Sequence, residues 1–280
     1  MTIAELLSAL WADYVASTPQ AERIHALLTA RGEMLLNDHV ALRTFDVREA
    51  GVDLGIDLGI DLGIEALARP FEALGWRPRE DYRFEDKKLR ARYWQHAEPG
   101  LPKVFISELV VRDLSPAAQQ AIGALVAQLP RGFDARPDLA LAGRPWQVSH
   151  ATYAALLAES EYAAWVAAFG WRVNHFTVDV NALSTFPDLE ALGAFLVDHG
   201  FTLNDAGGTI KGTPADRLEQ SSTRADSIEV AFADRTARIP SCYYEFARRY
   251  PLRSGDLFQG FVPTSADRLF ESTNVGGSRP

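Results

Sequence analysis

Two histidines and a glutamate are the residues of this chain best suited to bind a metal ion. His39 and His175 each lie near the start of an apolar segment typical of a β-strand, and Glu245 lies within another. A carboxylate in an apolar strand is costly to bury unless it is paired or binds a metal. Two imidazoles and one carboxylate leave adjacent coordination positions open, which suits non-haem iron(II) and bidentate substrates.

The spacing of these residues suggests a repeated arrangement. Glu108 lies 69 positions after His39, and Glu245 lies 70 positions after His175. Each glutamate is expected in the last strand of its unit, so Glu108 is a possible fourth ligand. The alternative is that both histidines are core residues paired with neighbouring carboxylates.

A buried arginine is expected on the same strand face as the first histidine. Side chains two positions apart share a face of a strand, so His39, Ala41 and Arg43 point one way. By the same rule, His175 shares a face with Thr177. The guanidinium of Arg43 could bind a substrate carboxylate through two hydrogen bonds, or it could form a salt bridge with a buried glutamate.

The remaining histidines have structural explanations. His25 is expected at the surface, His150 near a helix start, and His199 in a last helical turn, where a cation complements the helix dipole. His96 and Glu98 have a spacing that some oxygenases use for metal binding. A Pro-Gly dipeptide follows them at once, which favours a turn.

The elements that position the candidate ligands follow a helical region at about residues 1–33. Thr2 and Glu5 have the spacing of a capping box, and the apolar residues after them recur with helical periodicity. A second helix is expected from Thr18 to Gly32. Both helices are expected to pack on a larger domain.

The first module is expected at about residues 34–130 as a strand, a helix and three strands. The second is expected within about residues 131–280, after a connection and a helix, with a similar order of elements. In the first module the elements are predicted at His39–Phe45, Glu65–Leu74, near Tyr82, at Leu89–Trp94 and at Val104–Val111, followed by a helix at Ser115–Leu129. In the second they are predicted at Pro130–Pro145 (connection), Tyr153–Phe169, Val173–Val180, Leu189–His199, near Thr202, and at Arg217–Ser222, Ser227–Phe232 and Ile239–Phe246. We therefore expect an α+β fold in which residues 1–280 form a single catalytic domain.

A tandem repeat interrupts the first module. The tetrapeptide Asp-Leu-Gly-Ile occurs three times between Asp53 and Ile64. A four-residue period with a glycine in each copy favours neither a helix nor a strand. We interpret it as the expansion of a surface connection, which should leave the ligands in place.

Composition restricts the partners of the chain. Its net charge of -9, without any run of basic residues, makes nucleic acid and anionic membranes unexpected partners. The single cysteine, Cys242, excludes an intrachain disulfide and a thiolate metal cluster. The N-terminal segment lacks the basic start of a signal peptide, and no apolar run is long enough to cross a membrane. We expect a cytoplasmic protein.

Five motifs run in order along nearly the whole chain and resemble those of one family. They are Asn-Asp-His-Val-Ala-Leu-Arg-Thr-Phe at 37–45, Val-Asn-His-Phe-Thr at 173–177, Leu-Glu-Gln-Ser-Ser-Thr at 218–223, Tyr-Glu-Phe-Ala-Arg-Arg at 244–249 and Ser-Ala-Asp-Arg-Leu-Phe-Glu-Ser-Thr at 265–273. Together they resemble the 2-oxoadipate dioxygenase/decarboxylase family, also called 2-hydroxyglutarate synthase. The family pattern has one copy of the tetrapeptide, so the tandem repeat departs from it.

The resemblance implies a fold related to the vicinal oxygen chelate proteins, with iron(II) held by two histidines and one glutamate. These roles transfer to His39, His175 and Glu245, and the role of binding a substrate carboxylate transfers to Arg43. The resemblance does not imply that Glu108 is a ligand. Weaker candidates for polar contacts in the pocket are Thr177, Gln220, Ser221 and Tyr243.

The implied reaction converts 2-oxoadipate and O2 to 2-hydroxyglutarate and CO2, as in lysine degradation. A 2-oxo acid can chelate iron through its keto oxygen and adjacent carboxylate, and no separate 2-oxoglutarate or nicotinamide is needed. Two alternatives stay open. One is a redox-neutral lyase or isomerase that uses zinc, nickel or manganese with Glu108 as a fourth ligand, and the other is a non-catalytic small-molecule sensor.

Overall fold

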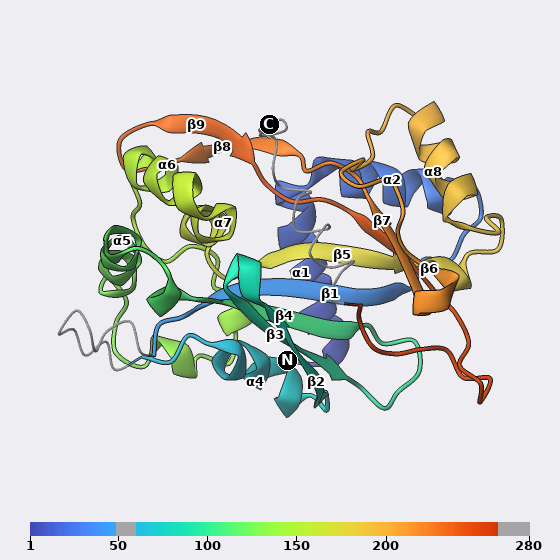
Figure 1. Cartoon of the computed structure of the whole chain (residues 1–280), viewed down its shortest axis with the longest axis horizontal. Helices are drawn as coiled ribbons and strands as arrows, with labels where there is room; N and C mark the ends of the chain where they lie inside the picture. Colours follow the sequence, from blue (N-terminus) through green and yellow to red (C-terminus); the bar gives the residue numbers. More distant parts are fainter. Residues whose placement is uncertain (49–59, 263–280) are drawn as a thin grey trace.

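The computed structural model describes residues 1–48 and 60–262, and these form a large mixed sheet, a small second sheet and surrounding helices (Figure 1). The strands are β1 (Asn37–Asp46), β2 (Arg77–Phe84), β3 (Leu89–Gln95), β4 (Lys103–Val110), β5 (Val173–Asp179), β6 (Lys211–Thr213), β7 (Leu218–Ser222), β8 (Ser227–Ala231), β9 (Thr236–Pro240) and β10 (Glu245–Arg249). The helices are α1 (Ile3–Ser17), α2 (Pro19–Ala30), α4 (Ile64–Ala73), α5 (Pro116–Val126), α6 (His150–Glu159), α7 (Glu161–Phe169) and α8 (Leu189–Asp198). The α+β class expected from the sequence is confirmed.

The large sheet has an internal two-fold arrangement. Its strand order is β2-β3-β4-β1-β5-β10-β7-β6, with β1 and β5 antiparallel at its centre. On each side the central strand pairs in parallel with the last strand of its own module, β4 or β10. The next strand outward, β3 or β7, is antiparallel to that one. The two expected modules are therefore the two halves of one continuous sheet.

The pairing of the central strands gives the position of this pseudo-two-fold axis. Val40 lies opposite Phe176, so a rotation that exchanges these two residues also carries His39 onto His175. The register shifts on either side at Asp38 and Asn174, which are therefore extra residues in equivalent places of β1 and β5. Such a bulge bends the strand and turns a side chain in a new direction.

The helices cover the sheet as their apolar faces require. Thr2 and Glu5 form the expected capping box, in which the backbone N–H of Glu5 bonds to Thr2 Oγ1 at 3.2 Å. In Figure 1, α1 passes behind β5 and β1, and Leu6, Leu10 and Tyr14 are buried on its inner side. The helices α4 and α8 pack on the first and second halves of the sheet. Within the described part of the chain, no helix is long and apolar enough to cross a membrane.

Three local predictions were wrong. The helix expected at Tyr153–Phe169 is two helices, α6 and α7, because Ser160 leaves the helical conformation and its hydroxyl accepts a bond from the backbone N–H of Ala163. Only an isolated bridge, Leu203 to Thr223, forms near Thr202, and the outermost strand of the second half is β6. The segment Ile239–Phe246 is divided between β9 and β10, and β8 pairs with β9 in a sheet of its own, because Ser241 to Tyr244 connect the two sheets.

The described end of the tandem repeat is also not a surface loop. Leu62 is fully buried and Ile60 and Ile64 are largely so, which contradicts the expected surface position. Thr44 Oγ1 donates a hydrogen bond to the carbonyl of Leu62 at 2.5 Å and ties this copy to β1. Residues 53–59, the rest of the repeat, lie outside the described residues, as does the motif at 265–273.

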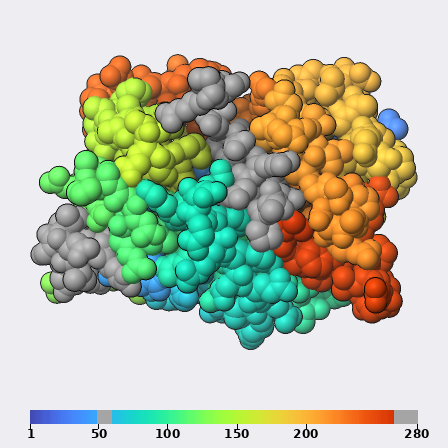
Figure 2. Space-filling model, viewed as in Figure 1, coloured from blue at the N-terminus to red at the C-terminus, as the bar shows by residue number. Residues whose placement is uncertain are grey.

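The segment after β10 lies between the two halves of the sheet. Figure 2 shows its red atoms between the teal surface of β2 and β3 and the orange surface of β6 and β7. It folds back so that the backbone N–H of Phe261 bonds to Tyr82 Oη at 3.0 Å. Phe261 thereby reaches the first half of the sheet, although it follows the last strand of the second.

Candidate metal and substrate site

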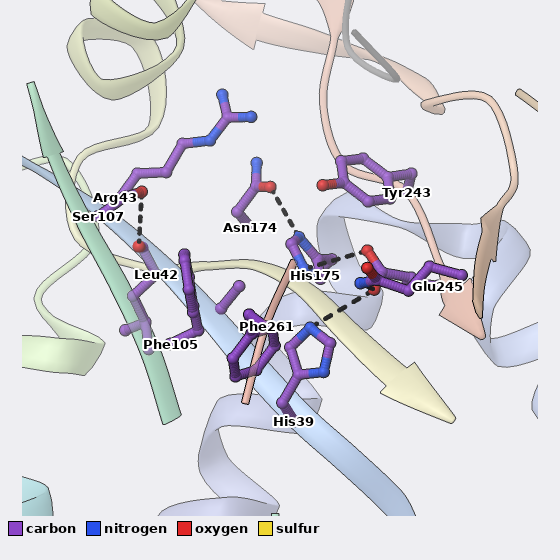
Figure 3. A pocket seen from close by; sticks show the side chains of 12 residues that line it. His39, Leu42, Arg43, Phe105, Ser107, Asn174, His175, Tyr243, Glu245 and Phe261 are labelled. Carbon is purple, nitrogen blue, oxygen red and sulfur yellow. Dashed lines mark hydrogen bonds and ion pairs between the residues drawn. The ribbon is translucent and has the colours of Figure 1, made fainter. Parts of the chain in front are cut away.

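Three ligand atoms from both halves of the sheet converge in one buried place (Figure 3). His39 comes from β1, His175 from β5 and Glu245 from β10. The two carboxylate oxygens lie 3.5 Å from His39 Nε2 and 3.4 Å from His175 Nε2, and the ligand atoms all lie within 4.8 Å of one another. Two nitrogens and one carboxylate at this spacing form a possible metal-binding triad.

Each histidine is held from behind by the bulged residue that precedes it. His39 Nδ1 lies 2.7 Å from Asp38 Oδ1, and His175 Nδ1 lies 3.0 Å from Asn174 Oδ1. An oxygen acceptor at Nδ1 keeps the proton there, so Nε2 presents its lone pair toward the triad. The two bulges therefore do the same work on the two sides of the pseudo-two-fold axis.

Asp38 is in turn fixed by buried cations. Arg249 donates to both of its oxygens, at 2.5 Å from Nε and 2.9 Å from Nη2, and Lys103 Nζ lies 3.9 Å away. Burial alone would raise the pKa of Asp38, but Arg249 and Lys103 outweigh it and hold the pKa well below its usual value. Asp38 is therefore ionised at neutral pH.

The electrostatics of the triad suit a cation. Burial lowers the pKa of His175 well below its usual value, and His39 and Arg43 lower it further, so the imidazole is neutral. Burial raises the pKa of Glu245 against the opposing effect of His39. A bound cation would favour the ionised carboxylate and offset this cost of burial.

Two polar side chains hold the triad in place. Gln220 Nε2, from β7, donates to Glu245 Oε1 at 2.7 Å. Thr177 Oγ1, from β5, lies 3.1 Å from His39 Nε2. Both were expected to contact the pocket; Gln220 lines it, whereas Thr177 contacts His39 without lining the pocket. Tyr243 stacks on the His175 ring at 4.6 Å between centroids and also lines the pocket.

Arg43 lies in the same pocket as the triad, as its position on β1 predicts. It is 1% exposed, and its guanidinium lies over the rings of Tyr162 and Trp165. Nη1 also forms an ion pair with Glu161 Oε1 at 3.2 Å. The two alternatives considered for Arg43 are thus compatible, because it both lines a pocket and pairs with a partly exposed glutamate.

The pocket is partly open to solvent, holds about 400 Å³ of space including its mouth, and has one metal-binding end and mostly apolar walls. Ala41, Leu42, Phe105 and Phe261 supply the apolar surface. The Phe261 ring packs edge-on against His39 at 4.9 Å between centroids. The full lining consists of His39, Ala41, Leu42, Arg43, Phe105, Ser107, Asn174, His175, Gln220, Tyr243, Glu245 and Phe261.

Glu108 has a different role from that of a fourth ligand. It accepts from the backbone N–H of Ile64 at 2.9 Å and pairs with Arg48 and Arg90 at 3.3 and 3.0 Å. It is outside the lining of the pocket and outside the triad. Glu108 lies beside Thr44 of β1 in the sheet, and its bond to Ile64 therefore fixes the start of α4 against the sheet.

The strand register explains why the nearly equal spacings from His39 to Glu108 and from His175 to Glu245 wrongly suggested that the two glutamates are equivalent. Glu245 pairs with Thr177, and the two-fold rotation carries Thr177 onto Ala41. The neighbour of Ala41 on β4 is Phe105, so the counterpart of Glu245 is Phe105. The near-equal distances along the sequence reflect connections of different length between the strands.

The other predictions for single residues had mixed outcomes. His150 begins α6, His199 follows α8 and bonds to the carbonyl of Phe195, and His96 lies between β3 and the expected turn at residues 99–100. His25 is half-buried against Trp11 at 5.3 Å rather than fully at the surface. Ser221 does not line the pocket, because it alternates with Gln220 on β7.

Sequence reasoning gave no role to Asp38, Asn174, Ser107, Phe105 and Phe261, and only the Asp or Asn before each histidine was a usable signal.

Comparison with known proteins agrees with this geometry. The model of the 2-oxoadipate dioxygenase/decarboxylase family matches residues 6–137 and 137–257. The chain belongs to this family. A rice protein named 2-oxoadipate dioxygenase/decarboxylase, chloroplastic/amyloplastic, is 36% identical over 287 residues, which cover 93% of this chain and 76% of that protein. Membership shows that the chain is an oxidoreductase enzyme.

Solved structures show the same fold. Rice hydroxyglutarate synthase in complex with 2-oxoadipate has a TM-score of 0.87 and 33% identity, covering 97% of this chain and 91% of that one. A Shewanella frigidimarina protein provisionally named a hydrolase has a TM-score of 0.84 and 46% identity, covering 93% and 97%. A Ralstonia eutropha protein provisionally assigned to the glyoxalase superfamily shares the fold, with a TM-score of 0.75, 24% identity, and coverage of 91% and 84%. The fold is therefore that of the vicinal oxygen chelate proteins.

Proposed function

We propose that this family member is an iron(II)-dependent enzyme that converts 2-oxoadipate and O2 to 2-hydroxyglutarate and CO2. The observation that carries the proposal is that the possible metal triad and the buried Arg43 line one pocket. One end of this pocket suits a metal and the other a carboxylate. The rice relative whose structure contains 2-oxoadipate supports the choice of substrate.

The reaction balances without another reductant or cofactor. 2-Oxoadipate loses its first carboxyl group as CO2, and one oxygen atom of O2 completes the new carboxyl group at the former keto carbon. The second oxygen atom is inserted into a C–H bond of the next carbon, which gives 2-hydroxyglutarate. When bound, iron(II) would supply the electrons that activate O2 and open positions for a bidentate 2-oxo acid.

The protein residues have separate tasks in this proposal. His39, His175 and Glu245 would hold the metal through two neutral nitrogens and a carboxylate. Gln220 keeps the carboxylate in position through its bond to Oε1. Arg43 would bind the carboxylate remote from the 2-oxo group and so orient the carbon that is hydroxylated.

The apolar walls have a task as well. Phe105 and Phe261 lie 4.8 Å apart between ring centroids and cover the side of the pocket nearest His39. Their rings exclude water from the three methylene groups of the substrate. A dry pocket also strengthens the electrostatic hold of Arg43 on a carboxylate.

The expected cytoplasmic location stays a prediction.

The first experiment is anaerobic loading of the full chain with iron(II), followed by addition of 2-oxoadipate and O2. We expect O2 uptake, CO2 release and 2-hydroxyglutarate formation in a 1:1:1 ratio, which follows from the balanced reaction. 2-Oxoglutarate and an aromatic 2-oxo acid are the comparison substrates. A loaded protein that consumes no O2 with any of them would refute the proposal, and zinc-loaded protein is the control for redox-neutral chemistry.

A further inference from the structure

Asn174 is a buried pocket residue that the triad does not fully explain. It is 1% exposed and lines the pocket together with Arg43 and His175. Its neighbour His175 points to the triad, so a regular strand would turn Asn174 to the opposite face. The bulge in β5 instead brings both consecutive side chains to the pocket.

The orientation of its amide group follows from the chemistry of His175. If Nε2 of His175 presents a lone pair to a metal, the ring proton is on Nδ1. Asn174 must then present its oxygen to Nδ1, at the observed 3.0 Å, and its amide nitrogen must face elsewhere. Figure 3 shows this nitrogen turned away from the His175 ring, in the region between Arg43 and Tyr243.

The amide nitrogen has no acceptor of its own in the protein. Among residues 1–48 and 60–262, no group accepts a hydrogen bond from Asn174 Nδ2, although the atom is buried. A buried donor without a partner is rare in folded proteins, because it has lost its hydrogen bonds to water. A donor of this kind in the wall of a pocket indicates an acceptor on the ligand.

Asp38 is the pseudo-two-fold counterpart of Asn174, and its different surroundings support the same conclusion. Asp38 bonds to His39 in the same way, but both of its oxygens are occupied by Arg249 and it does not line the pocket. One bulge thus carries an anion sealed by a cation, and the other carries a neutral donor open to the pocket. A neutral donor is the suitable choice beside an anionic substrate.

We propose that Asn174 Nδ2 donates a hydrogen bond to the substrate carboxylate that is remote from the 2-oxo group, next to Arg43. The inference rests on the proposed function. The remote carboxylate is the expected acceptor because Nδ1 and Asn174 lie on the side of the His175 ring that faces away from the triad. Asn174 is therefore a binding residue that helps the enzyme select dicarboxylic 2-oxo acids.

The test compares two ligands of equal chain length by anaerobic calorimetry on the iron(II)-loaded full chain. 2-Oxoadipate carries the remote carboxylate, and 2-oxohexanoate has a methyl group in its place. Asn174→Asp keeps the acceptor for His175 and removes the donor. We expect it to weaken 2-oxoadipate binding roughly 10- to 100-fold, because a charge-assisted hydrogen bond is lost and a carboxylate then faces the remote carboxylate of the ligand, and to change 2-oxohexanoate binding less than about threefold.

A second variant and a matched control separate binding from folding. Asn174→Ala also removes the donor, and we expect the ratio of its two Kd values to shift in the same direction, whatever its effect on the metal. Asp38→Asn changes the equivalent residue beside the other histidine. We expect it to weaken cobalt(II) binding, followed by the visible absorption of the ion, without changing the ratio of the two Kd values.

Several results would overturn the inference. An unchanged Kd ratio in both Asn174 variants, whether the two ligands weaken equally or not at all, would show that Asn174 acts only through His175. If the wild-type protein binds and converts 2-oxoadipate in that case, the proposed function stands and this inference alone fails. If the wild-type protein binds neither acid, the proposed function fails as well.

Discussion

The ion pair between Asp38 and Arg249 is expected to be one of the most sensitive places in the molecule. Arg249 is 3% exposed, and besides Asp38 it donates to the carbonyls of Phe258 and Gly260 at 3.0 and 2.8 Å. Its guanidinium also lies 5.2 Å from the ring centroid of Phe261. The pair therefore holds a candidate metal ligand on one side and a wall of the pocket on the other.

The substitution Asp38→Asn removes the charge and nearly keeps the shape. It leaves the buried guanidinium without its anion, and breaking a buried pair in this way costs about 3 to 5 kcal/mol. The acceptor for His39 Nδ1 also becomes weaker, for which a loss of about 10- to 100-fold in metal affinity is typical. We expect both effects in the same variant.

The assay combines urea unfolding of the metal-free protein with cobalt(II) titration. Arg249→Met and the double variant complete a thermodynamic cycle. We expect the double variant to be less destabilised than the sum of the single variants, because removing both partners leaves no buried charge unpaired. Asp138→Asn, at an exposed pair with Arg136, is the control and should change the free energy of unfolding by less than about 1 kcal/mol.

Two results would contradict the role given to the pair of Asp38 and Arg249. If Asp38→Asn lowers neither the free energy of unfolding nor the cobalt(II) affinity, the buried pair does not position His39. If the free energies of the two single variants simply add, the two residues do not act as a pair.

Three further predictions concern other parts of the molecule. Alanine at His39, His175 or Glu245 should lower iron(II) affinity more than the roughly 100-fold expected for an outer hydrogen-bond partner, with an unchanged circular dichroism spectrum, and retained iron in all three variants would contradict the triad. Arg43→Ala should keep iron and weaken 2-oxoadipate binding about 10- to 100-fold in calorimetry, and an equal Kd would exclude its carboxylate role. Glu33 accepts four hydrogen bonds that, against the effect of burial, lower its pKa to about 2. Because the folded-state pKa of Glu33 is lowered, its contribution of about 2 to 3 kcal/mol to the free energy of unfolding is present above pH 4.5 and is lost as the pH falls toward 2. Urea unfolding of Glu33→Gln and wild type at pH 7 and pH 3 should show a smaller difference in the free energy of unfolding at pH 3.

Most of the sheet could be predicted from the sequence, because the central strands β1, β4 and β5 are buried along nearly their whole length and appear in the sequence as short, largely apolar runs. The candidate ligands could be proposed for the same reason, since His39, His175 and Glu245 are polar residues in otherwise apolar strands. The break at Ser160 was missed because both flanking segments are apolar with helical periodicity. The separate pairing of β8 with β9 was missed because strand patterns do not specify which strands pair.

The finer features of the site depend on register, which the sequence does not state. Glu108 looked equivalent to Glu245 by spacing, whereas the strand pairing places Phe105 there. The bulges at Asp38 and Asn174 have no local signature beyond the polar residue before each histidine. Phe261 reaches the pocket through a chain reversal, and contacts of this kind are specified by tertiary packing alone.

The pseudo-two-fold axis has a consequence for the direction in which a substrate can enter. Two identical halves can only offer chemical groups in matched pairs, so a ligand with similar ends would fit equally well either way round. In this chain the pairing is kept for His39 and His175, but Glu245 is matched by Phe105 and Arg43 by Asp179. Because both halves belong to one chain, the two members of a pair can be different residues, and the two ends of the pocket therefore differ in their chemistry. A dicarboxylate whose two ends differ only in a keto group can then be read in a single direction.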